Sequence, residues 1–435
     1  MRNLLSRKLS HQIYVLANPT TLGIIGFSLV IQFLLFREHL NDAVLSSFGP
    51  NYTDANEYIK YADNWSSKGF SQSFSDLWRM PGYPAIILLF KNIFYTQPYL
   101  ALRIFQIILI ALSAGILQII LKKLATKKLS IVGSLLYSIF PTWYFSTVLY
   151  AEALTLCLVV FLMLIISQVN MYSISISKMV LIGILFALLI YLKPNNIILG
   201  LPIAVYIWSI QKKHILKFLL VIYLSTLVIL APWFIHISNT NPGFVGLTTT
   251  QGINLYIGVG MVPTQGNEML FNSGTNCNVD PQSNPVDILQ YGLNFDAGES
   301  TVLTKKSFEI WKERPKQQLC HAVNKILIAF GILANRPIDF TFGVFNLIAV
   351  ICAAFLRTQL KFRPWASVVL VTALVLMTQS AIFQADRRFV ITVFTPFAIV
   401  AQTLFLYSQQ TNIHKINRIF GKRFAKKYSV TRINP

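Results

Sequence analysis

The chain has 435 residues, of which 54% are hydrophobic and 12% charged, and its formal net charge is +21. Many of its apolar runs have about 17 to 23 residues, the length that crosses the hydrocarbon core of a bilayer. This composition excludes a soluble nucleic-acid-binding protein, because a basic protein of that class would not be so apolar. We therefore expect an all-α polytopic membrane protein.

The first apolar run covers residues 20–36 and follows a basic start at Arg2, Arg7 and Lys8. The run is long for a signal peptide and ends without a small-residue cleavage site, so we interpret it as a retained first span. Further spans are predicted at 98–121, 129–147, 150–168, 179–193, 195–210, 216–236, 340–357, 365–383 and 388–407. About ten spans leave both termini on one side of the membrane.

The charges are unevenly divided between the two sides. The short connections on the side of the termini carry Lys and Arg but no acidic residue, whereas all 16 Asp and Glu fall on the other side or at the outer ends of spans. An excess of Lys and Arg in short loops marks the cytoplasmic face. The pattern predicts a plasma-membrane protein with cytoplasmic termini, and it explains the net charge without a nucleic-acid partner.

Two connections on the outer side are large and interrupt an otherwise single integral membrane domain, 1–435. In the first, 37–97, the side chains of residues 54–66 repeat with a helical period, which predicts a helix. The apolar stretch 83–95 is too short to cross the bilayer and is predicted to lie along the interface. Because neither an internal repeat nor a deeply buried acidic residue indicates a rocking carrier, we expect function at the outer surface.

The second large connection, 237–339, has three predicted parts. Residues 237–295 are rich in Asn, Gly, Pro, Thr and Gln without a clear period, which indicates an ordered loop or a small substructure. Residues 297–314 are amphipathic, and Pro315 is expected to break or kink the chain after them. Residues 319–334 are predicted to form either a further interfacial helix or an extra span, and the charge distribution favours the interfacial helix.

Two of the four cysteines, Cys277 and Cys320, lie in the second large connection, whereas Cys157 and Cys352 lie in apolar runs. The outer face is oxidising, which favours a disulfide between Cys277 and Cys320. Two unpaired thiols remain the alternative, since sequence separation does not show whether the α-carbons approach.

A polar stretch, NYTDANEYIKYADNW, follows the first span and contains Asp54 and Glu57. The sequence Asp54-Ala-Asn-Glu57 has the spacing of a capping box, in which the first side chain closes the helix start and the fourth reaches back. A carboxylate here is also a candidate general base, provided that it meets an acceptor hydroxyl away from water. The two roles are compatible.

The stretch RMPGYP, 79–84, forms a rigid turn in prediction, because each proline fixes its own φ and extends the preceding residue. The order of three features resembles the membrane-embedded glycosyltransferases of the GT-C superfamily. These are a first span, then Asp-x-x-x-Tyr-x-x-x-Ala at Asp54, Tyr58 and Ala62, and then RMPGYP. The resemblance is strongest to bacterial relatives of the dolichyl-phosphate-mannose protein mannosyltransferases and of the lipid A aminoarabinose transferase. Other features agree in order over most of the chain: Pro141 before Glu152, Pro194, Pro232-Trp233, GINLYIGVG at 252–260 and DRRF at 386–389.

The resemblance implies a GT-C-like bundle in the bacterial inner membrane, surrounded by membrane lipids, with an extracytoplasmic active site. The donor would be a sugar on a polyprenyl phosphate, and the acceptor a glycan, a lipid or a protein. By its match to the family's first-loop aspartate, Asp54 would be the catalytic base for an inverting displacement. The leaving group is already a phosphate anion, so cations are needed rather than a general acid.

The candidates for binding the donor phosphate or lining the cavity share a predicted place at the outer rim. Arg387 and Arg388 rank first, because a guanidinium binds phosphate through two parallel hydrogen bonds. Simple snorkelling of these side chains toward the headgroups is the alternative reading. The full set is Arg387, Arg388, Arg79, Lys193, His236, Glu57, Glu152 and Tyr58.

No Walker loop, dinucleotide fingerprint, HExxH or CxxC motif is present, so no cofactor is predicted with certainty. Many members of the GT-C family have a second acidic residue at the position of Ala55. The sequence therefore does not decide whether a divalent metal ion binds at the donor phosphate. Two other functions fit the same sequence. One is a transporter or flippase for a lipid-linked sugar, and the other is a non-catalytic membrane subunit of an envelope glycan assembly.

Overall fold

The computed structural model of the chain describes residues 18–37, 54–140, 148–169, 175–210, 215–244, 246–260, 297–332, 337–383, 388 and 390–428. Helices form most of this part, and no β-strand occurs within it. The fold is therefore all-α over the described ranges, as expected.

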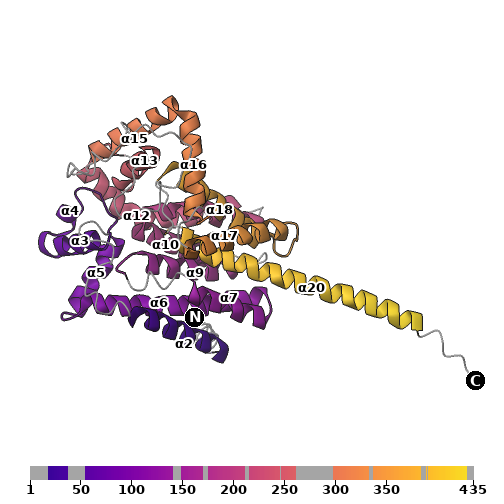
Figure 1. Cartoon of the computed structure of the whole chain (residues 1–435). Helices are drawn as coiled ribbons and strands as arrows, with labels where there is room; N and C mark the ends of the chain where they lie inside the picture. Colours follow the sequence, from indigo (N-terminus) through magenta and orange to yellow (C-terminus); the bar gives the residue numbers. More distant parts are fainter. Residues whose placement is uncertain are drawn as a thin grey trace, which may run out of the picture.

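A bundle of apolar helices forms the body of the molecule (Figure 1). In it α2 packs on α6, α6 on α9, α10 on α12, α11 on α18, and α17 on α20. The largest buried cluster fills the space between these helices, with Leu117, Val159, Ile190, Val369 and Phe394 among its members. The bundle elements are α2 (Pro19–Arg37), α6 (Pro98–Leu124), α7 (Lys127–Ile139), α9 (Glu152–Ser167), α10 (Ile176–Leu192), η1 (Pro194–Leu199), α11 (Gly200–Ile210), α12 (Ile215–Thr240), α17 (Pro337–Leu356), α18 (Arg363–Ile382), η4 (Val390–Phe394) and α20 (Thr395–Tyr428).

Within the described part of the chain, five helices are long and apolar enough to cross a membrane, which indicates an integral membrane protein. Those helices are Pro19–Arg37, Pro98–Leu124, Ile215–Thr240, Arg363–Ile382 and Val390–Ile413. Each of the other predicted spans also coincides with helix where the chain is described. Their apolar helices have 17 residues or fewer, as does Phe340–Leu356 within α17, and α7 has only 13. Since such a helix is only about 20 Å long, the number of ten spans stays a prediction.

The two large connections supply a second group of helices. They are α3 (Asp54–Lys68), α4 (Phe70–Ser73), α5 (Gly82–Ile93), α13 (Thr250–Gly260), α15 (Ala297–Glu313) and α16 (Pro315–Ala329). The predicted helices at 54–66, 83–95, 297–314 and 319–334 correspond to α3, α5, α15 and α16, and Pro315 separates the last two. Whether these helices lie at the membrane interface stays a prediction.

Part of the segment 237–295, predicted as an ordered loop or a small substructure without a clear period, is helical. Residues Thr250–Gly260 form α13, whose segment GINLYIGVG holds three glycines and therefore lowers the helix signal. Packing against α15 overrides that propensity, because Gly252 lies directly against the Ser300 backbone. The remainder, 261–296, lies outside the described residues.

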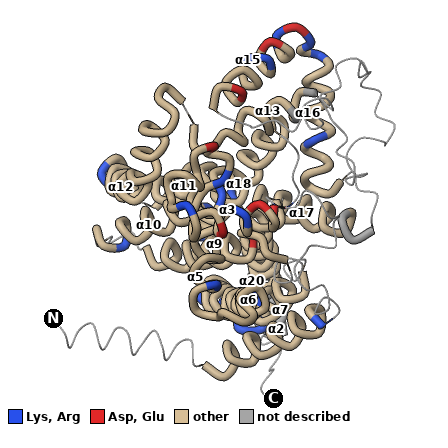
Figure 2. The backbone as a smooth tube through the Cα atoms, turned by 90° about the vertical axis from the view of Figure 1, so that its left-hand side faces the viewer, with Lys and Arg blue, Asp and Glu red and all other residues tan. Residues whose placement is uncertain are grey.

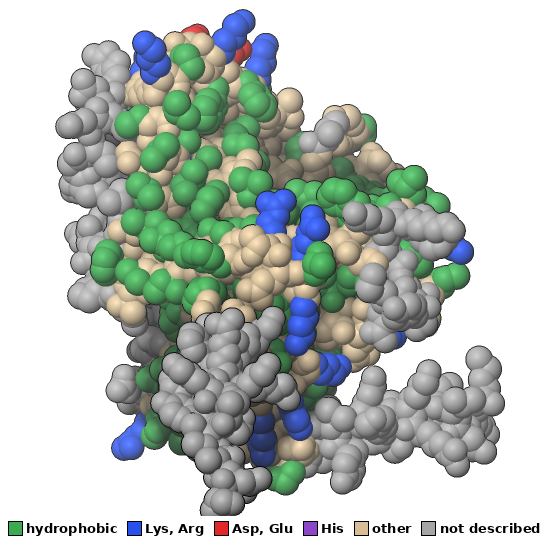
Figure 3. Space-filling view, turned by 90° about the vertical axis from the view of Figure 1, so that its right-hand side faces the viewer, with side chains coloured by type: hydrophobic (Ala, Val, Ile, Leu, Met, Phe, Trp, Pro, Cys, Tyr) green, Lys and Arg blue, Asp and Glu red, His purple; other side chains and the backbone are tan. Residues whose placement is uncertain are grey.

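The two ends of the bundle differ in charge. We call the end that carries α3, α4 and α13 the α3 end, and the end from which α20 projects the α20 end (Figure 1). Viewed from the α3 end, the backbone positions of acidic residues lie near α3 and α9, beside basic ones, and along α15 (Figure 2). On the face toward the α20 end, among the described residues that are visible, Lys and Arg are scattered and acidic side chains appear at the top edge (Figure 3).

Gly82 is the residue at which α5 meets the bundle. A Cβ built on it would lie 2.5 Å from the carbonyl oxygen of Tyr191 and 2.7 Å from its carbonyl carbon, at the end of α10. Backbone therefore touches backbone here, which only glycine permits. Close packing against α10 thus explains why a glycine stands between the two prolines, which the predicted turn alone does not explain.

We expect Gly82→Ala to destabilise the protein by about 1 to 3 kcal/mol, because the added methyl group overpacks a rigid backbone contact. Thermal unfolding in detergent measures the effect. Gly26→Ala is the matched control, since no atom lies within 4 Å of a Cβ there and alanine favours the helix. Equal unfolding temperatures for Gly82→Ala and Gly26→Ala would contradict the expected close contact.

Candidate active site

The site is built around the first residue of α3, Asp54. Tyr58, one turn later, is 2% exposed, and its ring meets that of Tyr83 edge-on at a centroid distance of 4.9 Å. This contact fixes α3 on α5, as the helical period of the aromatic residues suggests. The start of α3 is thereby held at the α3 end of the bundle, where α9 and α10 also have an end.

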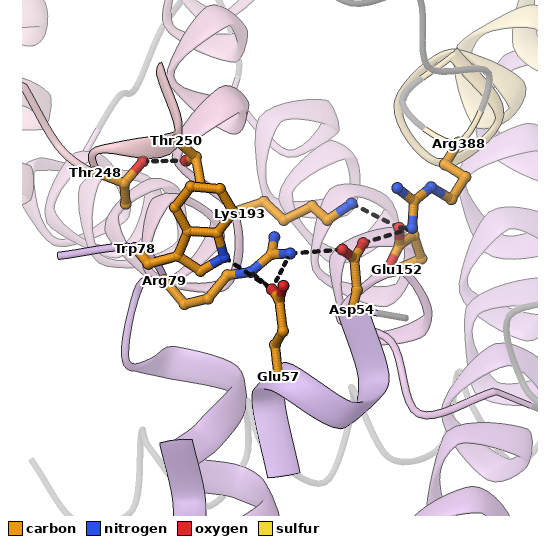
Figure 4. Close-up of polar contacts among 9 residues, drawn as sticks. All are labelled: Asp54, Glu57, Trp78, Arg79, Glu152, Lys193, Thr248, Thr250 and Arg388. Atoms are coloured by element: carbon orange, nitrogen blue, oxygen red, sulfur yellow. Dashed lines mark hydrogen bonds and ion pairs between the residues drawn. The ribbon is translucent and has the colours of Figure 1, made fainter. Parts of the chain in front are cut away.

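Both carboxylate oxygens of Asp54 accept a hydrogen bond from an arginine (Figure 4). Nη2 of Arg79 donates to Oδ1 at 2.6 Å, and Nη1 of Arg388 donates to Oδ2 at 2.6 Å. Arg79 follows α4, whereas Arg388 stands 334 positions away from Asp54, before η4. One carboxylate therefore joins the first large connection to the last part of the chain.

Glu57 holds Arg79 in this orientation. Its Oε2 accepts a hydrogen bond from Nε of Arg79 at 2.6 Å and another from the indole Nε1 of Trp78 at 2.9 Å. The guanidinium also lies 5.3 Å from the ring centroid of Tyr58, a cation–π distance. Since its planar group is fixed on several sides, Arg79 presents a constant geometry to Asp54.

Glu152 forms the second centre of charge, at the start of α9. Its side chain is 1% exposed, and its Oε1 accepts a hydrogen bond from Nζ of Lys193 at 2.6 Å. Nη1 of Arg388 lies 3.6 Å from the same oxygen, so Arg388 stands between Asp54 and Glu152. Arg388 is also 5.2 Å from the ring centroid of Tyr150. Three carboxylates and three cations thus form one connected, nearly neutral cluster, the Asp54 cluster.

The cations set the protonation state of Asp54. Burial alone would raise the pKa of this carboxyl, but the charges of Arg79 and Arg388, followed by that of Lys193, outweigh it and hold the pKa well below its usual range. Burial would lower the pKa of Arg79, and the charges of Asp54 and Glu57 raise it above its ordinary value instead. A carboxylate held between two guanidinium groups is a weak base until one partner moves.

The structure brings most of the predicted site residues into this cluster: Asp54, Glu57, Tyr58, Arg79, Glu152, Lys193 and Arg388. His236 has other described contacts, because its Nε2 lies 3.0 Å from the carbonyl oxygen of Phe74 and its ring meets that of Phe70. It ties α12 to α4. Arg387 lies outside the described residues.

The capping box predicted for Asp54 and Glu57 is not what the described contacts show. The hydrogen bonds of both carboxylates described here run to Arg79, Arg388 and Trp78 rather than to the backbone of the first turn of α3. Ion pairs with guanidinium groups are stronger than capping hydrogen bonds to backbone amides, so both carboxylates bind arginine instead.

Trp78 is the cluster member that sequence reasoning missed. Its only signal was its place beside Arg79 and before RMPGYP. The segment that leads into α13 lies next to it, since the amide of Thr249 donates to the Leu77 carbonyl at 3.0 Å and its hydroxyl to that of Asp76 at 3.0 Å. The hydroxyls of Thr248 and Thr250 are 2.6 Å apart in the same place (Figure 4).

The cysteines follow the division predicted from their surroundings. Cys320 on α16 is held in a disulfide bond, whereas Cys157 and Cys352 are free thiols. Cys277, the expected partner of Cys320, lies outside the described residues.

The described residues show no ready-made site for a divalent metal ion. Among them, no three His, Cys, Asp or Glu side chains are grouped so as to hold one. Asp54 and Glu152 are both contacted by Arg388, whose guanidinium occupies the position that a shared metal would need. A metal bound by both carboxylates would have to displace Arg388.

Comparison with known proteins gives likeness in structure alone. No protein-family model matches the sequence, and no curated protein matches it. The oligosaccharyltransferase of Archaeoglobus fulgidus in its apo form has a TM-score of 0.53 and 12% identity over 92% of this chain and 52% of its own. The same enzyme, AglB, in complex with an inhibitory peptide and a dolichol-phosphate gives 0.53 and 12% over 97% and 53%, and its complex with Zn and sulfate gives 0.52 and 12% over 95% and 52%.

The chain thus spans about half the length of these structures. At such identity the likeness shows the fold alone: this chain folds like that part of the oligosaccharyltransferase. Membership of the GT-C superfamily is supported by this likeness and stays an inference. The finer assignment, to the relatives of the protein mannosyltransferases and the aminoarabinose transferase, stays a prediction.

We expect Asp54→Asn to lower the free energy of unfolding at pH 7 by on the order of 1 to 3 kcal/mol, because two guanidinium groups lose their charged acceptor. The pKa of Asp54 is lower in the folded than in the unfolded protein. The stabilisation is therefore complete above about pH 4 and is lost as the pH falls further.

Thermal unfolding of wild type and Asp54→Asn between pH 7 and pH 3 measures this difference in stability. The gap between the two unfolding temperatures should become smaller toward pH 3. The matched control is Asp63→Asn, because Asp63 pairs with Lys91 at an exposed site where an ion pair contributes little. A difference between wild type and Asp54→Asn that stays constant with pH would contradict the described ion pairs.

Proposed function

We propose that this protein is an inverting glycosyltransferase that moves a sugar from a polyprenyl-phosphate donor to an acceptor hydroxyl. One observation carries the proposal: Asp54, shortly after the first span, shares a cluster with Arg79, Arg388 and Lys193 at one end of an apolar bundle. A base and a set of cations are the two groups that this reaction needs. A lipid-linked substrate reaches such a place from the bilayer.

The comparisons support the same class of reaction. The structural neighbour AglB is an oligosaccharyltransferase, and one of its structures contains a dolichol-phosphate and an inhibitory peptide. Another is tethered to an acceptor peptide. A lipid phosphate and an acceptor are thus ligands of a protein with this fold. Because the present chain has about half that length, its own donor and acceptor belong to the proposal.

In the proposed reaction the donor phosphate competes with Asp54 for Arg388. Arg388 has five N–H donors and Lys193 has three, so a bound phosphate can take hydrogen bonds from both in exchange for some that they make in the free protein. Once Arg388 turns toward the phosphate, Oδ2 of Asp54 loses a hydrogen bond and part of the charge that depresses its pKa. Asp54 thereby becomes a better base when the donor is bound.

The displacement itself is a single step. The acceptor oxygen attacks the anomeric carbon and gives its proton to Oδ2 of Asp54, while the bond between the anomeric carbon and the phosphate oxygen breaks. The bonding electrons leave with the lipid phosphate, whose negative charge Arg388 and Lys193 stabilise. Arg79, fixed by Glu57 and Trp78, keeps Oδ1 of Asp54 in place throughout.

We assign the α3 end to the extracytoplasmic side and the α20 end, with both termini, to the cytoplasm of a bacterial inner membrane. The scarcity of acidic side chains on the face toward the α20 end supports this orientation (Figure 3). The acceptor, whether a glycan, a lipid or a protein, would then approach from outside. Residues 237–295 are placed in sequence to contact it, and the part around Thr249 lies next to Trp78.

We expect Asp54→Asn and Arg388→Gln each to lower kcat by about 100-fold or more, because one removes the base and the other a cation at the leaving group. The assay uses purified protein in detergent, a radiolabelled prenyl-phosphate sugar and a cell-envelope acceptor fraction. Mass spectrometry of envelope glycans with and without the protein identifies the acceptor. Asp63→Asn is the control and should retain full activity.

In detergent there are no longer two compartments, so transport across a membrane cannot be observed whereas sugar transfer can. The assay in detergent therefore distinguishes an enzyme from a transporter. Wild-type protein that translocates the lipid-linked sugar in vesicles but transfers nothing in detergent would contradict the proposal and support a flippase. Protein with neither activity, whose Asp54→Asn variant still supports the envelope glycan in cells, would support a non-catalytic subunit.

We expect chelation by EDTA to change the transfer rate by less than about twofold, because a metal ion bound by both Asp54 and Glu152 would have to displace Arg388 from between them. The same assay with and without added Mg²⁺ or Zn²⁺ makes the comparison. Loss of activity in EDTA that a divalent ion restores would show that a metal takes part.

A further inference from the structure

A buried polar stripe runs along α16, away from the Asp54 cluster. Gln318, His321 and Lys325 follow one another at helical spacing, and their side chains are 2%, 1% and 1% exposed. On the other side of the same helix Leu319 and Val323 are exposed. Polar side chains thus point inward on α16, which predicts that they hydrogen-bond to buried groups.

Lys325 reaches two helices at once. Its Nζ donates to the carbonyl oxygen of Gly258 in α13 at 2.7 Å and lies 3.3 Å from that of Phe383, the residue that ends α18. Gln318 supports the same contact, because its Nε2 donates to the carbonyl oxygen of Val259 at 2.9 Å. The last carbonyls of a helix have no partner within it, so these side chains satisfy groups that would otherwise be buried alone.

The two helix ends that Lys325 joins are in direct contact. A Cβ on Gly258 would lie 2.6 Å from the carbonyl oxygen of Ile382 and 2.8 Å from the carbonyl carbon of Phe383. Glycine therefore lets the backbone of α13 touch the end of α18. Both carbonyl oxygens face the ammonium group of Lys325, so this side chain, which comes from α16, holds the ends of α13 and α18 together.

Arg388 follows this junction by only five positions. We propose that Lys325 is a positioning residue for Arg388: by holding the end of α18 against α13, it fixes the point from which the chain runs to the guanidinium that binds Asp54. The expected effect of Lys325 on sugar transfer rests on the proposed function. The expected effect of Lys325 on the structure of the chain around Arg388 does not.

The linkage does not depend on the charge of Lys325. Burial lowers the pKa of this amine to about 7, and burial together with the charge of Lys325 lowers the pKa of His321 to about 4. Neither α13 nor the half of α18 next to Phe383 has an acidic or basic residue. A neutral amine still has two N–H donors, one for each of the two carbonyl oxygens, so both bonds survive deprotonation.

Hydrogen–deuterium exchange on the full-length protein in detergent tests the positioning directly. In Lys325→Met, the amides of 383–394 should exchange at least about tenfold faster than in wild type, since two hydrogen bonds are lost. Lys316→Met, which removes an exposed lysine from the same helix, should leave them unchanged. Unchanged exchange in Lys325→Met, or an equal rise in α2 and α6, would overturn the proposal.

Gly258→Ala provides a second variant, in case Lys325→Met does not fold. It opens the same junction without removing the lysine and should accelerate exchange over the same residues. Unchanged exchange at 383–394 in this variant would likewise count against the junction as the support of Arg388.

Transfer kinetics then test the consequence. Lys325→Met should lower kcat, and it should have no further effect in the Arg388→Gln background, because a residue that acts through Arg388 has nothing left to position. Independent, multiplicative losses in the double variant would overturn the proposal. If Arg388→Gln alone leaves transfer intact, the proposed function fails, and the exchange measurement still decides whether Lys325 supports the chain around Arg388.

Discussion

One carboxylate shared between two guanidinium groups determines the geometry of the α3 end. Asp54 receives Arg79 from the first large connection and Arg388 from the chain after α18. Each partner is restrained in turn, Arg79 by Glu57 and Trp78, and Arg388 by its approach to Glu152. Charges at the edge of an apolar bundle are tolerated only when paired, so this network also closes the bundle where α3, α9 and α10 have their ends.

The same pairing that stabilises the site restrains its chemistry. A carboxylate with both oxygens bound to arginine is a poor proton acceptor, and a guanidinium bound to carboxylates is only partly free for a phosphate. Under the proposed function, a donor phosphate would relieve both restraints at once, because it would take Arg388 and leave Oδ2 of Asp54 available. In this account the substrate itself activates the base, and the acceptor hydroxyl loses its proton only after the sugar donor is in place.

Sequence patterns identified many parts of this site but not how they meet. The period of Tyr58, Tyr61 and Trp65 predicted α3, and the family resemblance singled out Asp54 and Arg79, which are local in sequence. The pairing of Arg388 with Asp54 depends on how α18 and η4 pack, which no local pattern encodes. Likewise α13 was missed because tertiary packing overrode its glycines, and Gly82 had a reason visible only once α5 met α10.

An experimental structure of the protein with a bound prenyl phosphate tests the central claim most directly. The account predicts that the phosphate oxygens lie within hydrogen-bonding distance of Arg388 and Lys193, and that the bond from Arg388 to Oδ2 of Asp54 is broken while the bond from Arg79 to Oδ1 remains. A phosphate bound elsewhere, with both arginines still on Asp54, would contradict it.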